Sequence, residues 1–123
     1  MLITTIIFLR NLIYEGILCY QMVNTISPAQ LKEAIDQYHI LDVREPDEES
    51  NGKIDGSTLM PLGLSIRNTK QGKLDDLKGK KICTYCASGY RANIAAEELE
   101  KAGFDVVNLE GGFMGWQNHN NSS

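Results

Sequence analysis

One segment constrains the fold of this chain more than any other: residues 81–92, Lys-Ile-Cys-Thr-Tyr-Cys-Ala-Ser-Gly-Tyr-Arg-Ala. Residues 82–85 predict a short buried strand, because β-branched and aromatic side chains follow one another there without a breaker. The residues from Ala92 onward predict a helix, so residues 86–91 form the turn between the two. A strand that runs through a short turn into a helix is typical of an α/β fold with a parallel sheet.

Cys86 opens that turn, which predicts a thiol at the carboxyl end of a strand and just before a helix. The backbone N–H groups of the turn and the positive end of the helix dipole favour an anion there, and therefore the thiolate. Glycine adopts positive φ at little cost, so Gly89 suits a loop that curls back on itself. The Arg91 guanidinium can hold an oxyanion through two hydrogen bonds. We expect an anion-binding loop with a catalytic sulfur at its base, formed by Ala87, Ser88, Gly89, Tyr90 and Arg91.

The length of this loop separates two classes of cysteine enzyme. Cysteine phosphatases use Cys-x5-Arg, whereas the spacing here is Cys-x4-Arg, a tighter ring that is better matched to one extra sulfur atom. Cys-Ala-Ser-Gly-Tyr-Arg resembles the active-site loop of rhodanese-type sulfurtransferases. Further segments carry the same resemblance, so that it covers roughly Met22 to Trp116. They are similar to the family's Asp-x-Arg segment (residues 40–48), its Gly-His-Ile-x-Gly-Ala turn (residues 52–57) and its Gly-Gly-x3-Trp box (residues 109–116).

The resemblance implies a fold and a reaction. The fold would be a rhodanese-like α/β domain, with a five-stranded, mostly parallel sheet in the strand order 1-5-4-2-3 and helices on both faces. The reaction would be that of a thiosulfate sulfurtransferase: Cys86 takes a sulfane sulfur from a small anionic donor, thiosulfate or another persulfide. The Cys86 persulfide then passes this sulfur to a thiophilic acceptor, which is cyanide, a thiol or a protein cysteine. No metal or organic cofactor is expected.

Five positions support or modify this prediction. Asp42 and Arg44 leave the carboxyl end of a predicted strand, and we interpret both as supporting residues that tie loops together. Lys53 stands where the family usually has His, which leaves a fixed cation in place of a titratable ring. Ala87 stands where many thiosulfate-using members carry a basic residue, and Tyr90 adds bulk at the mouth of the loop. Thiosulfate is therefore expected to be a poor donor.

Other functions stay open at this point. A persulfide carrier or binding module that works only with a protein partner would use the same loop. A cysteine phosphatase or arsenate reductase fits less well because the loop is short. A redox Cys-x-x-C formed by Cys83 and Cys86 fits poorly, since three strand residues separate the Cα atoms by about 10 Å and a disulfide tolerates up to about 7 Å. The three cysteines, of which the third is Cys19, form no disulfide framework and suit a reducing compartment.

Several elements are predicted outside the loop. Ser27 is the expected N-cap of a helix, with Pro28 at its first position and Gln30 completing a capping box. We expect this helix to carry one apolar face and to reach Tyr38. Residues 62–80 read as a polar loop with one helical turn near Leu74 and Leu77. The remaining predictions are strands at residues 23–26, 40–43, 58–60 and 106–109, a short acidic helix at residues 46–50, a helix from residue 92 that ends at Gly103, and a short helix through Trp116.

Length and charge bound the organisation of the chain. A chain of 123 residues predicts one domain, and its net charge of −4 argues against general nucleic-acid binding. We expect an apolar extension at residues 1–21, the domain at residues 22–117 and a frayed polar tail at residues 118–123. The extension is too short in apolar residues to span a bilayer. It could pack on the domain or on a second copy, act as a degenerate export signal, or precede a start at Met22. We expect a cytoplasmic protein, or an exported one if the extension is a signal, and the oligomeric state stays open.

Overall fold

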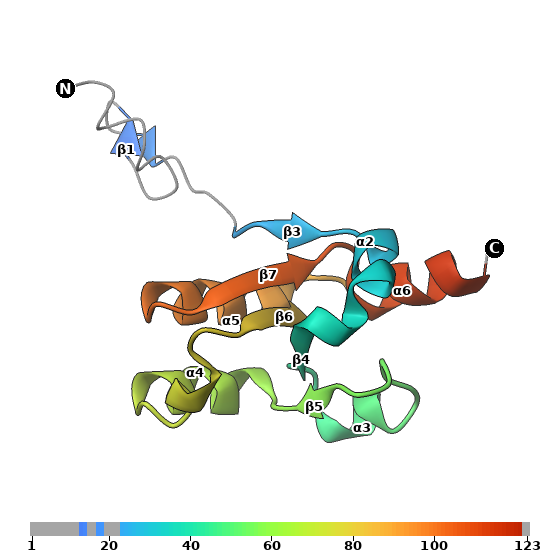
Figure 1. Cartoon of the computed structure of the whole chain (residues 1–123), viewed down its shortest axis with the longest axis horizontal. Coiled ribbons are helices and arrows are strands. Elements are labelled where there is room, and N and C mark those ends of the chain that lie inside the picture. The colour runs from blue at the N-terminus through green and yellow to red at the C-terminus, as the bar shows by residue number, and fades with distance from the viewer. Residues whose placement is uncertain (1–12, 15–16, 19–22, 122–123) are drawn as a thin grey trace.

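The computed structural model describes residues 13–14, 17–18 and 23–121. Five strands form one sheet, in which all neighbouring strands are parallel. The order across the sheet is β3 (Thr25–Ile26), β7 (Asp105–Leu109), β6 (Lys81–Tyr85), β4 (Tyr38–Asp42) and β5 (Thr58–Leu59) (Figure 1). Numbered along the domain, this is the order 1-5-4-2-3 that the resemblance implies. The predicted fold class is therefore confirmed.

The helices cover both faces of this sheet. One face carries α4 (Leu62–Lys70) and α5 (Tyr90–Lys101), and the other carries α2 (Pro28–Glu33) and α6 (Gly112–Asn121) (Figure 1). Side chains of the central strand alternate between the two layers, as expected for a period of two. Ile82 packs with Leu99 of α5, whereas Cys83 packs with Leu31 of α2. The described residues also form the short helices η2 (Ile35–Gln37), α3 (Pro46–Glu49) and η3 (Asp75–Leu77).

The predicted helix boundaries with a capping signal are confirmed. The Ser27 hydroxyl accepts from the Gln30 N–H at 3.1 Å, and the Ser27 N–H donates to Gln30 Oε1 at 3.0 Å, so both bonds of the capping box are present. Gly103 follows the end of α5 with a φ of 95°, the left-handed conformation that favours glycine after a helix. The short acidic helix and the helical turn near Leu74 and Leu77 are also present, as α3 and η3.

Three predicted segments differ. Tyr38 is not helical: α2 ends at Glu33, and Tyr38 begins β4 and pairs with Lys81. The polar stretch after Pro61 is not a loop, because its first part forms α4. This helix places two hydroxyl side chains in the interior, where each donates to a carbonyl: Ser65 to Met60 at 2.6 Å and Thr69 to Ser65 at 2.7 Å. Satisfied hydroxyls remain buried at little cost, which is why a helix with so few apolar residues packs here.

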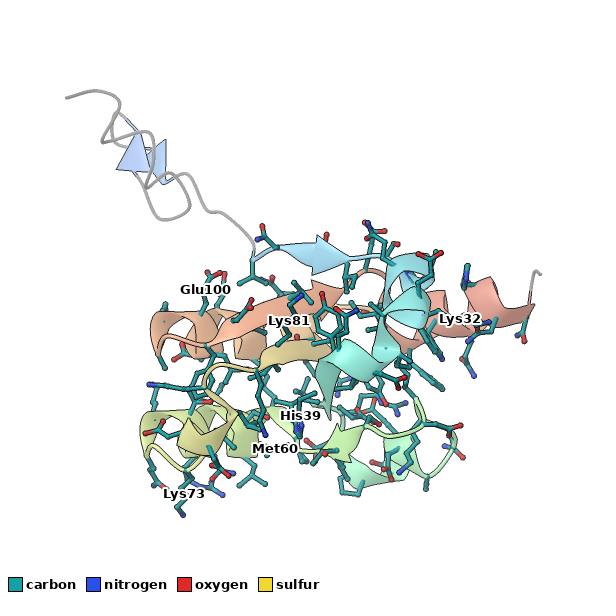
Figure 2. All side chains as sticks on the ribbon, in the orientation of Figure 1. Lys32, His39, Met60, Lys73, Lys81 and Glu100 are labelled. Carbon is teal, nitrogen blue, oxygen red and sulfur yellow. The ribbon has the colours of Figure 1, made fainter. Side chains whose placement is uncertain are left out.

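The third difference is at the carboxyl side of the described residues, where α6 continues to Asn121 instead of ending near Trp116. Lys32 of α2 donates to the Asn120 side chain at 3.0 Å and so joins the two helices on that face. Figure 2 shows Lys32 on this side of the molecule and Lys73 at the far end, beyond α4.

The predictions for residues 1–21 fall almost entirely outside the described residues. In that region only β1 (Ile13–Tyr14) and β2 (Ile17–Leu18) are described, as an antiparallel pair. Within the part of the chain that is described, no helix has the length and apolar character that crossing a membrane requires.

Candidate active site

Cys86 lies directly after the last residue of β6, and α5 begins four residues later, at Tyr90. Its sulfur accepts two backbone hydrogen bonds, from the Gly89 N–H at 3.0 Å and from the Ala92 N–H at 3.4 Å. Gly89 is the N-cap residue of α5 and has a φ of 119°, a conformation that a side chain at this position would strain. The sulfur thus takes the place of a capping group for α5.

The donors differ in part from the predicted set. We expected donors from residues 87–91, and Gly89 belongs to that range. Ala92, in the first turn of α5, lies one residue beyond it and was missed. Both N–H groups point toward the sulfur, as an anion at this position requires.

The surroundings of the sulfur are apolar as well. Cys86 is 1% exposed and packs in a cluster with Val43, Ala92 and Ala95, with Leu62 against it. Burial among apolar side chains opposes a charge, and the two N–H donors oppose that effect. A reagent must therefore present a slender end, such as a terminal sulfur, to reach the Cys86 sulfur.

Arg91 forms an ion pair with Glu48. Its two terminal nitrogens donate to the two carboxylate oxygens of Glu48 in α3, at 2.7 and 2.8 Å. The paired guanidinium, together with the Glu45 N–H, lowers the pKa of Glu48 to about 2, and the Glu48 carboxylate raises the pKa of Arg91. Sequence reasoning missed Glu48, which precedes Arg91 by 43 residues. The oxyanion-binding role of Arg91 stays a prediction, since its fork already holds a carboxylate.

Asp42 and Arg44 form a buried pair that ties loops together. The Asp42 carboxylate accepts from Arg44 Nε at 2.8 Å and from Arg44 Nη2 at 2.7 Å, and the two residues are 0% and 3% exposed. The same Nη2 donates to the Gly52 carbonyl at 2.8 Å, and the Tyr85 hydroxyl donates to Asp42 at 2.9 Å. The Arg44 guanidinium also lies 4.6 Å from the centre of the Phe113 ring in α6. These contacts fasten the strand that leads into Cys86.

Tyr85 extends this network to the turn that carries Lys53. The Tyr85 hydroxyl accepts from the Ile54 N–H at 3.1 Å and shares a hydrogen bond with Ser57. The Lys53 ammonium lies 3.6 Å from a carboxylate oxygen of Glu49 in α3. Lys53 borders a hollow on the α2 and α6 side, together with Ile54, Trp116 and others, and no residue of the Cys86 loop lines it. The structure thus groups Lys53 with α3 and α6.

The start of α6 binds the backbone carbonyls of the loop. The Phe113 N–H donates to the Cys86 carbonyl at 2.8 Å, and the Met114 N–H donates to the Ala87 carbonyl at 3.1 Å. A Cβ atom on Gly112 would lie 2.6 Å from both of those carbonyl oxygens, so only glycine allows this approach. The Gly-Gly pair in the sequence signalled a turn, but nothing in the sequence signalled its contact with Cys86.

Two side chains fix the far side of the loop. The Asn108 amide nitrogen in β7 donates to the Gly89 carbonyl at 3.1 Å, and the Thr84 hydroxyl in β6 donates to the Ala92 carbonyl at 3.1 Å. Both residues are buried in the sheet. They hold the backbone on either side of Tyr90, so the two N–H groups that face the sulfur stay in position.

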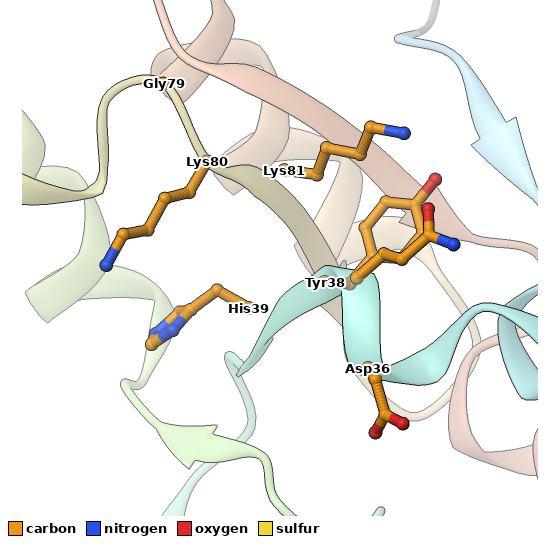
Figure 3. A pocket seen from close by; sticks show the side chains of 7 residues that line it. Asp36, Tyr38, His39, Gly79, Lys80 and Lys81 are labelled. Carbon is orange, nitrogen blue, oxygen red and sulfur yellow. The ribbon is translucent and has the colours of Figure 1, made fainter.

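The surface has one hollow near the carboxyl ends of the strands and another near their amino ends. Beside the loop, a groove with a volume of about 360 Å³ is lined by Thr25, Ser88, Gly89, Tyr90 and residues 108–111. A second hollow, of about 400 Å³, lies at the amino ends of β4 and β6. Figure 3 shows His39, Lys80, Lys81 and Tyr38 around it. Of these two, the groove is lined by residues of the Cys86 loop and the second hollow is not. In the described residues, no group of three or more His, Cys, Asp or Glu could hold a metal ion.

Comparisons with known proteins agree with this geometry. "Putative sulfurtransferase YtwF" of Bacillus subtilis is 36% identical over 77% of this chain and 91% of its own length. "Probable adenylyltransferase/sulfurtransferase MoeZ" of Mycobacterium tuberculosis is 34% identical over 76% of this chain, which spans only 24% of that protein's length. The crystal structure of a rhodanese-related protein from Thermoplasma volcanium has a TM-score of 0.68 and 34% identity, covering 78% of this chain and 92% of that one.

Relatives also carry other names. A tRNA uridine(34) hydroxylase of Cytophaga hutchinsonii is 34% identical over 72% of this chain and 30% of its own length. A structure from Rhodopseudomonas palustris, described as a protein of unknown function and possible tyrosine phosphatase, has a TM-score of 0.71 and 30% identity, covering 80% and 82% of the two chains. The sequence model of the rhodanese-like domain matches residues 27–119. This chain therefore belongs to the rhodanese-like domain family.

Proposed function

We propose that this protein is a sulfurtransferase that carries sulfane sulfur as a persulfide on Cys86. The Cys86 thiolate attacks the outer sulfur of thiosulfate or of another persulfide, and a bond forms between the two sulfur atoms. The electron pair of the donor's own sulfur–sulfur bond leaves with sulfite or with a thiolate. A thiophilic acceptor, cyanide or a thiol, then attacks the outer sulfur and releases the Cys86 thiolate.

One observation carries this proposal: the Cys86 sulfur accepts N–H groups from Gly89 and Ala92 at the start of α5. Two donors aimed at one sulfur stabilise the negative charge that it holds before attack and regains when the acceptor takes its sulfur. This is nucleophilic catalysis in which electrostatic surroundings, and not an adjacent base, activate the nucleophile.

The relatives named as sulfurtransferases support the same chemistry. YtwF matches along 91% of its length, whereas the matching region is only 24% of MoeZ. Because other relatives carry other names and one fold can host different reactions, a direct test of the sulfur adduct is needed.

Intact mass spectrometry tests the proposal. The protein is treated with thiosulfate or with glutathione persulfide, and we expect a gain of one sulfur atom that cyanide removes. The gain should be absent in Cys86→Ser and present in Cys83→Ala, which removes the other cysteine of the strand. A wild-type protein that gains no sulfur from either donor, or a Cys86→Ser protein that still does, would overturn the proposal.

A phosphatase reaction on the same loop is tested separately. The wild-type protein and Cys86→Ser are compared in the hydrolysis of a chromogenic phosphate ester. We expect no turnover above background with either, because the Cys-x4-Arg loop is one residue shorter than the phosphatase loop and Arg91 already holds Glu48. Turnover that disappears in Cys86→Ser would replace the sulfurtransferase proposal by a phosphatase one.

A further inference from the structure

In the described part of the chain, two large hydrophobic side chains are exposed to solvent. One belongs to the Cys86 loop, and the other is on a residue whose N–H binds that loop. Tyr90 is 75% exposed and follows Gly89 at the start of α5, and Met114 is 58% exposed on α6. The Met114 N–H donates to the Ala87 carbonyl, so its residue is bound to the loop directly. Large exposed apolar side chains on residues that belong to or bind one loop are candidates for an interaction site, because Tyr and Met are enriched in protein interfaces.

The groove beside the loop continues this surface. Tyr90 forms part of its wall, and its lining is mostly apolar, with Leu109 and two glycines, Gly89 and Gly111. Its volume of about 360 Å³ lies at the low end of the range for ligand pockets, about 300–1,000 Å³. Together, Tyr90, Met114 and this groove form what we call the rim surface.

The charges at the rim surface do not favour a small anion. Arg91 is the only cation among residues 86–91 and the residues that line the groove, and both of its terminal nitrogens are paired with Glu48. Ala87 contributes no charge, and the exposed Glu110 lies at the groove and adds a negative one. A doubly charged anion meets no unpaired cation here, whereas a neutral or basic peptide complements Glu110 and the net charge of −4.

We propose that the rim surface binds a cysteine-bearing segment of an acceptor protein, with apolar residues beside the cysteine and no net negative charge. This inference rests on the proposed persulfide of Cys86 and names the class of its acceptor. A protruding segment satisfies both demands of the site, since its cysteine reaches the buried sulfur while its neighbours cover Tyr90 and Met114.

The transfer balances without a further reactant. The thiolate of the acceptor cysteine attacks the outer sulfur of the Cys86 persulfide, and a sulfur–sulfur bond forms on the acceptor. The bond between Cys86 Sγ and the outer sulfur breaks, and its electron pair stays on Sγ. Cys86 is regenerated as the thiolate that faces the Gly89 and Ala92 N–H groups, and the acceptor leaves as a persulfide.

A peptide library tests the inference because it samples many acceptor sequences at once. The full chain is loaded with sulfur from glutathione persulfide and freed of excess donor. It is then mixed with peptides that carry one central cysteine between randomised residues, with free cysteine as reference. We expect the peptides that gain sulfur to be enriched in apolar residues and depleted in acidic ones, and to react about tenfold faster than free cysteine, as one interface anchor allows.

Variants connect this preference to the rim surface. In the double variant Tyr90→Ser/Met114→Ser, we expect the ratio of peptide rate to cyanide rate to fall about tenfold and the sequence preference to disappear. Lys101→Ser, an exposed change at the other end of α5, should leave both unchanged. Transfer to all peptides at the rate of free cysteine, or a preference that survives in the double variant, would overturn the inference.

The two proposals fail in different ways. If Cys86 never gains sulfur, mass spectrometry shows it before any acceptor is added, and the proposed function fails. If the sulfur is gained and released to cyanide but the library shows no preference, only the acceptor class is wrong. Selection of acidic peptides would also contradict the inference, because it would require an unpaired cation at the rim.

Discussion

Cys83 and Cys86 lie three residues apart, and their thiols are equally buried, at 0% and 1% exposure, yet they occupy opposite chemical surroundings. Cys83 lies inside β6, where its thiol can donate only a long contact to the Thr84 carbonyl at 3.8 Å, and burial raises its pKa to about 12. Cys86 lies just past the strand, where its sulfur accepts from two N–H groups. Equal burial therefore does not mean equal surroundings, because the backbone atoms that face the two sulfurs differ.

The largest expected effect comes from removing each of the two thiols in turn. We expect Cys86→Ser to reduce sulfur transfer to cyanide more than about a thousandfold, because it removes the nucleophile. Cys83→Ala should keep transfer within a few-fold of wild type and cost about 1–2 kcal/mol of stability, as for other small losses from a core. Steady-state assays and urea unfolding measure the two effects. Comparable losses of transfer in both variants would contradict the contrast.

The next effect concerns the carbonyl side of the loop. Gly112→Ala should destabilise the protein by about 2–4 kcal/mol, because its Cβ would lie 2.6 Å from the Cys86 and Ala87 oxygens at a φ of 59°. Sulfur transfer should fall with it, since the loop must move. Gly63→Ala is the matched control: Gly63 lies in α4 with open space around it, so this change should be neutral or slightly stabilising. Urea denaturation of both variants measures the difference.

The stability of the protein at alkaline pH tests the surroundings of Cys83. Its folded pKa of about 12 lies above its ordinary value of 9.0, so the unfolded chain loses this proton first. The stability that the neutral thiol contributes is intact below about pH 9 and is lost as the pH rises toward about 12. Unfolding free energies measured across this window should fall more steeply for wild type than for Cys83→Ala. Parallel curves would mean that the Cys83 thiol titrates as it does in water.

The stability at acidic pH tests the Glu48–Arg91 pair beside the Cys86 loop, and here we expect the smallest change in unfolding free energy. The folded pKa of Glu48 is about 2, below its ordinary value of 4.5, because Arg91 binds the carboxylate. Its contribution is present above about pH 4.5 and is lost as the pH falls toward 2. Glu48→Gln should flatten the stability curve in this window, and Glu49→Gln, which removes only the pair with Lys53 at 3.6 Å, should not. Thermal melts at pH 2 to 5 would measure both.

Local signals in the sequence predicted local structure well. The Ser27–Gln30 capping box, the Gly103 stop and the strand before Cys86 depend on neighbouring residues, and all three are confirmed. The strand order came from the family resemblance, because short strands of similar composition do not reveal which of them pair. Tyr38 was misassigned because it continues the apolar spacing of α2, although pairing with Lys81 places it in a strand.

In the candidate site, too, the residues within the local strand–loop–helix pattern were predicted, and those from distant elements were not. Cys86 and Gly89 were predicted from the strand–loop–helix pattern, and the Gly89 N–H does face the sulfur. Glu48, Gly112 and Asn108 were not predicted, because each reaches the loop from another element: α3, α6 and β7. Contacts between distant segments depend on how the layers pack, which a single sequence does not encode in any short pattern. Neither the pairing of Arg91 nor the exposure of Met114 could therefore be anticipated.

The contact between α6 and the loop makes α6 part of the candidate site. Because the Phe113 and Met114 N–H groups donate to the Cys86 and Ala87 carbonyls, proteolytic removal of the chain after Glu110 would leave the two peptide groups that flank Ala87 without these partners. We therefore expect loss of α6 to abolish the proposed sulfur transfer, although α6 lies near the carboxyl terminus. Adding the excised helix back as a free peptide would restore the centre only if it reseated Gly112 between those two oxygens.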